Sequence, residues 1–90
     1  MADYKVLLKS SAAKEIESVR SKGDRRPIVD RIAGLAAEPR SLKSEKLAGY
    51  DDRYRIRQGH YRIVYLIDDS RHEVTIFKVG HRKDVHRQVI

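Results

Sequence analysis

The segment from Arg53 to Arg62 constrains the fold more than any other, because cationic and apolar residues alternate in it with the period of a β-strand. Gln58-Gly59 predicts a two-residue turn in its middle, which folds the segment into a hairpin. In that register Arg55 lies directly opposite Arg62. We then expect four basic side chains on one face of the hairpin: Arg55, Arg57, His60 and Arg62.

The opposite face of this hairpin is apolar and suited to packing, since it carries Tyr54, Ile56 and Tyr61. Like charges that face each other on a β-ladder are destabilising. Placing Arg55 against Arg62 therefore favours an anionic ligand between them, and the planar fork of arginine suits a phosphate. The simpler alternative is a solvated strand face, which is what most charged runs are.

The remaining sequence predicts an α+β fold in one domain, residues 1–90. A strand at residues 4–8 is followed by two amphipathic helices, one from Ser10-Ser11 to Lys22-Gly23 and one from Asp24 to Glu38-Pro39. The period then changes to that of strands, which we expect at residues 53–58, 61–68 and 73–79. The predicted order is β-α-α-β-β-β, an antiparallel-rich sheet with both N-terminal helices packed on one face.

Charge and composition restrict the partners and the chemistry. A formal charge of +7 over 90 residues attracts polyanions. No cysteine is present, so disulfides and thiolate chemistry are excluded. His81 and His86 stand five residues apart without a supporting carboxylate, so we expect neither a metal site nor a cofactor. We see no signal peptide and no run of about 18 apolar residues, and we expect a cytoplasmic protein that does not bind a membrane.

Four blocks of the sequence, in this order, resemble the RelE/ParE superfamily of type II toxins, nearest to its RelE side. They are Lys46-Leu47-Ala48-Gly49, Tyr54-Arg55-Ile56-Arg57, Tyr61-Arg62-Ile63-Val64-Tyr65 and Val79-Gly80-His81-Arg82-Lys83-Asp84-Val85. The resemblance covers nearly the whole chain. It implies a small RelE-like domain that enters the ribosomal A site, cleaves the mRNA codon there and so inhibits translation. It also implies a cognate antitoxin, which the charge of +7 predicts to be acidic.

The chemistry that the resemblance implies is transesterification. The 2′-hydroxyl attacks the adjacent phosphate, a 2′,3′-cyclic phosphate forms and the 5′-oxygen leaves. Arg55 and Arg57 correspond to a basic pair on the first strand of the meander, and Arg62 to the arginine that stabilises the phosphate. Arg82 corresponds to the arginine assigned to the leaving group, and His86 falls at or near a base-stacking tyrosine. Six further RNA contacts are expected: Lys46, Arg53, His60, Lys78, His81 and Lys83.

Arginine stays charged near neutral pH, so neither residue of the basic pair is a credible general base. Histidine can titrate there, and we assign the proton transfer to His86, with His60 and His81 as alternatives. Hydroxide or a ribosomal group could also accept the proton. Two other functions stay open: a ParE-like toxin that inhibits DNA gyrase and lacks the catalytic basic set, and a basic nucleic-acid-binding module without catalysis. The retained arginines favour the nuclease.

Overall fold

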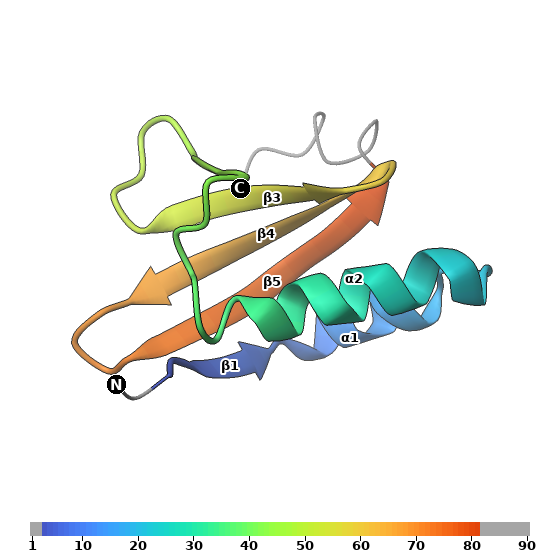
Figure 1. Ribbon diagram of the computed structural model, residues 1–90, viewed down its shortest axis with the longest axis horizontal. Helices are drawn as coiled ribbons and strands as arrows, with labels where there is room; N and C mark the ends of the chain where they lie inside the picture. The colour runs from blue at the N-terminus through green and yellow to red at the C-terminus, as the bar shows by residue number, and fades with distance from the viewer. Residues whose placement is uncertain (1–2, 82–90) are drawn as a thin grey trace.

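The computed structural model describes residues 3–81, in which five strands form one sheet and two helices cover one of its faces (Figure 1). The elements are β1 (Lys5–Leu8), α1 (Ser10–Glu17), α2 (Lys22–Gly34), β2 (Ser44–Lys46), β3 (Arg53–Gln58), β4 (Tyr61–Asp68) and β5 (Glu73–His81). The predicted α+β fold with two helices on one face is confirmed. The structure adds β2, a strand of three residues that the sequence did not predict.

The strands lie in the order β1-β5-β4-β3-β2, so the first two strands of the chain form the two edges. All neighbouring pairs are antiparallel except β1 and β5, which are parallel. The chain between the edges crosses one face of the sheet as α1 and α2 (Figure 1). This path explains why both helices lie on one side of the sheet.

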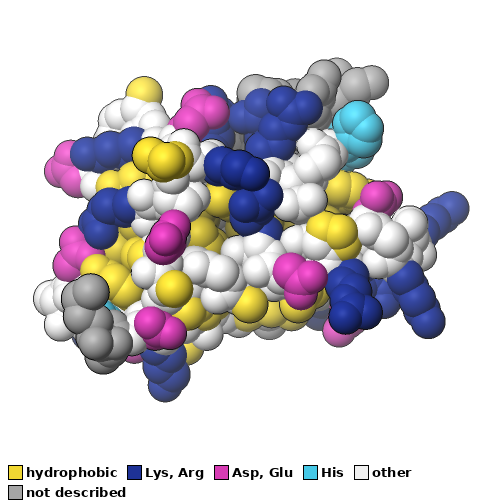
Figure 2. All heavy atoms as spheres, viewed as in Figure 1, with side chains coloured by type: hydrophobic (Ala, Val, Ile, Leu, Met, Phe, Trp, Pro, Cys, Tyr) yellow, Lys and Arg dark blue, Asp and Glu magenta, His cyan; other side chains and the backbone are white. Residues whose placement is uncertain are grey.

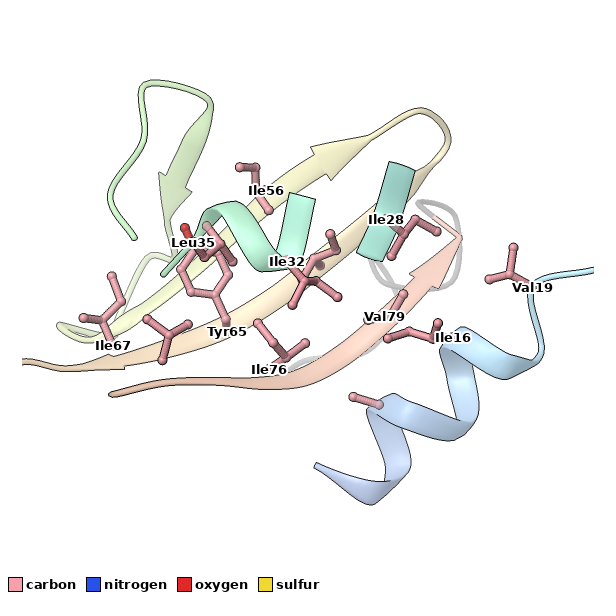
Figure 3. Close-up of a cluster of buried hydrophobic side chains, with 13 residues drawn as sticks. Ile16, Val19, Ile28, Ile32, Leu35, Ile56, Tyr65, Ile67, Ile76 and Val79 are labelled. Carbon is pink, nitrogen blue, oxygen red and sulfur yellow. The ribbon is translucent and has the colours of Figure 1, made fainter. Parts of the chain in front are cut away.

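The core lies between the helices and the sheet, where apolar side chains from the two layers point toward each other (Figure 3). Ile16, Ile28 and Ile32 come from the helices. The sheet contributes residues that alternate along β4 and the first half of β5, as period-two burial requires, together with Ile56 of β3 and with Val79 beyond an irregularity in β5. These are Ile56, Ile63, Tyr65, Ile67, Val74, Ile76 and Val79, each with an exposed fraction of 3% or less.

The link between the helices differs from the prediction. Helix α1 ends at Glu17, well before Lys22-Gly23, and α2 begins at Lys22 rather than at Asp24. Val19, in the link, is buried, and its carbonyl accepts hydrogen bonds from the Arg25 side chain at 2.8 and 3.3 Å. Burial of Val19 and the guanidinium that satisfies its carbonyl stabilise a non-helical link, which local helix propensity cannot reveal.

The turn of the β3–β4 hairpin is also shifted. It is formed by Gly59 and His60, one residue later than predicted. Gly59 has a φ of 61° at the first central position, where a type II′ turn requires glycine. His60 therefore lies in the turn and not on the strand face where it was predicted.

The shifted turn changes which arginines face each other. Arg57 lies opposite Arg62, and Arg55 lies opposite Val64, so the predicted pairing of Arg55 with Arg62 is wrong. The partner of Arg62 on β3 is Arg57 instead of the predicted Arg55, a shift of two residues. Since side chains alternate with a period of two, this shift leaves each strand residue on its predicted face. Tyr54, Ile56 and Tyr61 still share the face that packs against the helices, as predicted.

Candidate nucleic-acid interface

The face of the sheet opposite the helices, which we call the arginine face, carries an arginine at every second position of β3. We define this face by the side chains of Arg53, Arg55, Arg57, Arg62, Val64, Leu66, Thr75 and Phe77. Successive arginines on β3 are about 7 Å apart along the strand. On the side of the molecule seen in Figure 2, basic side chains are scattered among acidic ones. The arginine face differs because four cations stand together on two adjacent strands.

Arg57 and Arg62 form the closest cationic pair of this face, because they are directly opposite each other on the ladder. The Arg57 Nε donates a hydrogen bond to the Gly59 carbonyl at 3.1 Å, which holds this side chain beside the turn. On the far side of Arg62, the facing residue of β5 is Gly80, which contributes no side chain. The row Arg57–Arg62–Gly80 therefore places two like charges opposite each other, an arrangement that an anion would stabilise.

Arg55 is held by an acidic residue that the sequence analysis missed. Its Nη2 lies 3.2 Å from Oε2 of Glu45, which β2 places opposite it. The Glu45 side chain is 68% exposed, and an exposed ion pair of this kind contributes little to stability. A phosphate can therefore replace Glu45 at Arg55 at small cost. Only a tertiary pairing reveals this contact, since β2 is too short to show a strand pattern.

The Nε atoms of Arg53 and Arg55 are buried and have no hydrogen-bond partner among residues 3–81. Buried polar atoms nearly always have a partner, so such exceptions require an explanation. Guanidinium groups at these positions would gain from an acceptor oxygen. This observation fits a face that binds an anionic ligand.

Three aromatic side chains lie at the hairpin end of the arginine row. The rings of His60 and His81 stack with their centroids 6.0 Å apart, and the Tyr61 ring meets His81 edge-on at 5.7 Å. His81 is the Cα partner of Tyr61, next to the pair Arg62–Gly80. The structure thus brings His60 and His81, two of the predicted RNA-binding residues, to the same end of the sheet as Arg57 and Arg62.

Two predicted RNA contacts lie apart from this row. The Lys78 Nζ is 2.6 Å from Oε2 of Glu15, whose Oε1 accepts the backbone N–H of Val79 at 2.9 Å. The pairing of β1 with β5 ends at Ile76, and Glu15 contacts the next part of β5, at Lys78 and Val79. Lys46 lies opposite Tyr54 on the edge strand, on the side of the helices, with its Nζ 4.0 Å from Asp51. Lys46 thus lies outside the arginine row. Lys78 is opposite Val64 in the register, but Glu15 binds its ammonium group.

The remaining predicted site residues, Arg82, Lys83 and His86, lie outside the described residues. Within residues 3–81, no group of three histidine, aspartate or glutamate side chains is arranged to hold a metal ion. In the same part of the chain no helix is both long enough and apolar enough to cross a membrane.

Comparison with known proteins identifies the class to which this fold and this basic face belong. Residues 6–86 match the family model for the ParE toxin of type II toxin-antitoxin systems, parDE. Because the match spans most of the chain, the protein belongs to this family, within the RelE/ParE superfamily, and is a type II toxin. The resemblance drawn from the sequence motifs is thus confirmed. A search of curated proteins gave no match.

Solved structures that resemble this chain come from RelE toxins. The toxin-antitoxin complex RelBE2 of Mycobacterium tuberculosis matches with 27% identity and a TM-score of 0.77, over 89% of this chain and 99% of that one. The archaeal RelE-RelB complex of Pyrococcus horikoshii matches with 27% identity and a TM-score of 0.76, over 89% and 96%. The isolated E. coli RelE toxin matches with 25% identity and a TM-score of 0.76, over 93% and 97%.

Proposed function

We propose that this toxin is a ribosome-dependent endoribonuclease that cleaves the mRNA codon in the A site. The observation that carries the proposal is the row of arginines on the arginine face, with Arg57 directly opposite Arg62. Two guanidinium groups at this spacing suit a single phosphate, whose charge grows when the 2′-hydroxyl attacks it. The similarity to RelE structures supports the same function.

The proposed reaction needs one proton removed and one delivered. A base takes the proton of the 2′-hydroxyl, the oxygen attacks phosphorus, and the bond from phosphorus to the 5′-oxygen breaks to leave a 2′,3′-cyclic phosphate. Arg55, Arg57 and Arg62 stabilise the phosphorane charge. They stay protonated and do not act as the base. We assign proton transfer to His86 and the stabilisation of the leaving oxygen to Arg82, both carried over from the family resemblance.

The closest rival is inhibition of DNA gyrase, which the match to the ParE family model favours. A toxin that only binds gyrase has no evident need for a cationic pair across a hairpin. Primer extension on translated mRNA after expression of the toxin should show cuts within codons. A gyrase supercoiling assay with the same protein should show no inhibition. Inhibited supercoiling together with intact mRNA would reject the nuclease in favour of a gyrase poison.

Dependence on the ribosome follows from the position of the arginines on the surface of a sheet, which cannot by itself align the 2′-hydroxyl. Alignment by the ribosome contributes up to roughly 7 to 11 kcal/mol of the barrier. We therefore expect naked mRNA to be a poor substrate. Efficient cleavage of ribosome-free mRNA at the same codons would contradict this part of the proposal.

The antitoxin is proposed to be an acidic, largely extended chain that folds on binding and neutralises the charge of +7. Structures of relatives from M. tuberculosis and P. horikoshii are toxin-antitoxin complexes, which supports such a partner. The toxin and this partner would act in the cytoplasm, where the ribosomes are. Co-purification with the product of the adjacent reading frame tests the proposal, and a partner that is not acidic would contradict its electrostatic basis.

A further inference from the structure

Phe77, an aromatic residue on the arginine face, lies at a β-bulge in β5. Val64 pairs with Lys78 and Tyr65 pairs with Ile76, so Phe77 has no partner on β4. Two residues instead of one therefore separate the buried Ile76 from the next buried residue of β5. Bulges re-aim side chains and occur often beside functional sites. Here Phe77, at the bulge, lies close to Arg53 of β3.

Two cations from distant parts of the chain approach the Phe77 ring. The Arg53 Cζ is 5.4 Å from its centroid, and the Lys9 Nζ is 6.0 Å from it. Tyr50 supports the arginine from another side, with its ring centroid 4.6 Å from Cζ. Among residues 3–81, no carboxylate forms an ion pair with either cation. The aromatic ring and the two charges therefore form a cluster that lacks an anion.

A hollow of about 410 Å³ is lined by Lys9, Arg53 and Phe77, together with Leu66 and Thr75. The hollow continues the arginine row, because Arg53 is the next arginine of β3 after Arg55 on the same face. An extended strand that leaves the pair Arg57–Arg62 along β3 would reach the hollow after about 14 Å. The hollow thus lies at the end of the arginine row that is farther from the hairpin turn.

We infer that this hollow is a subsite for a single-stranded RNA nucleotide that flanks the cleaved phosphate. In it the base stacks on Phe77, and Lys9 and Arg53 bind the phosphate. Single-stranded nucleic acid is held by this combination of an aromatic platform and a cationic groove. An acidic peptide would use the two cations but would have no need for the ring, so the chemistry favours RNA. The inference rests on the proposed RNA cleavage.

The test compares oligoribonucleotides of three and six residues, made uncleavable by 2′-deoxy substitution at the attacking position, in fluorescence anisotropy. The longer RNA should bind the wild type about 5- to 150-fold more tightly, the gain expected when one base stacks. Phe77→Leu should abolish this gain. Lys9→Gln should weaken the longer RNA and reduce the salt dependence of its binding by about 0.7 in log–log slope. Lys22→Gln, an exposed lysine of α2, is the matched control.

Several outcomes would overturn the subsite. One is a wild type that binds both lengths equally. Another is a pair of variants, Phe77→Leu and Lys9→Gln, that bind the longer RNA as the wild type does. Weakened binding of the antitoxin with unchanged binding of RNA would assign the hollow to the antitoxin instead. Lys9 is exposed, so Lys9→Gln decides the question even where Phe77→Leu fails to fold.

The ribosomal cleavage assay on wild-type protein is scored separately. If it shows no cuts while the length effect persists, the nuclease proposal fails and the hollow still stands as an RNA site. If it shows cuts and the two variants bind RNA normally, only the subsite fails.

Discussion

The two faces of β4 differ in what determines their residues. Toward the helices, Ile63, Tyr65 and Ile67 are buried, and their side chains form part of the core. Toward the other side, the same strand begins with Arg62, directly opposite another arginine. Burial selects residues all along the first face. On the second face it selects Val64, whereas Arg62 at the hairpin end opposes stability, since like charges on a ladder repel each other. We therefore expect a substitution at Ile63 to affect folding, and a substitution at the adjacent Arg62 to affect activity.

The largest effect is expected on the helix-covered face, from Ile63→Ala. Ile63 has an exposed fraction of 0%, and its truncation leaves a cavity between the sheet and the helices. We expect the free energy of unfolding to fall by about 2 to 5 kcal/mol in urea denaturation. Ile63→Val, which removes one methylene group, should cost about 0.5 to 1.5 kcal/mol. An Ile63→Ala protein as stable as the wild type would show that this face does not carry the stability.

The neighbouring substitution Arg62→Ala should have the opposite profile. It removes one donor from the proposed phosphate site, and we expect a loss of transition-state stabilisation of about 2 to 4 kcal/mol. Ribosomal cleavage would then slow by about 30- to 1,000-fold, with the thermal unfolding midpoint unchanged or raised. Arg26→Ala, at an exposed position of α2, is the matched control and should cleave normally. Wild-type growth inhibition by Arg62→Ala would eliminate the nuclease assignment.

A smaller effect is expected from Tyr65→Phe, a change of one buried oxygen. The Tyr65 hydroxyl donates a 2.6 Å hydrogen bond to the carbonyl of Pro39, and burial raises the pKa of this hydroxyl. Without the hydroxyl, the carbonyl loses its partner, at a cost of about 1 to 3 kcal/mol. Tyr54→Phe is the control, because the Tyr54 oxygen accepts an exposed hydrogen bond from Arg40. Equal stability losses in the two variants would show that burial of the oxygen is unimportant.

Apart from His60, which lies in the turn, the period-two pattern predicted which residues of β3 and β4 occupy each face, because one buried face fixes the alternation along a strand. It did not predict the pairing of Arg57 with Arg62, which depends on the backbone conformation of Gly59 in the turn. Nor could it predict Glu45 or the bulge at Phe77, since both arise from contacts between strands. Local periodicity thus predicts which face of the sheet a residue occupies. Which side chains meet in the candidate site depends on the pairing register of the strands, which periodicity does not give.

The turn between β4 and β5 belongs to neither face of the sheet. A substitution in it, at Asp69, should have the smallest effect on stability. Hydrogen bonds donated by Arg40, at 2.7 and 3.1 Å, and by the Tyr4 hydroxyl, at 2.6 Å, lower the pKa of Asp69. The folded pKa therefore lies below the unfolded value of about 3.9, so the stabilisation is present above pH 3.9 and is lost as pH falls through the folded pKa.

We accordingly expect Asp69→Asn to unfold at a lower temperature than the wild type at pH 5 to 6. The two melting curves should converge as pH falls through the folded pKa of Asp69, because the native carboxylate then becomes protonated as well. The difference at pH 5 to 6 should be modest, because the Arg40 and Asp69 side chains are 44% and 59% exposed and exposed ion pairs contribute little. Asp30→Asn, on the exposed surface of α2, is the control. A gap between wild type and Asp69→Asn that does not narrow at all as pH falls below about 3.9 would show that the aspartate acts through packing and not through its charge.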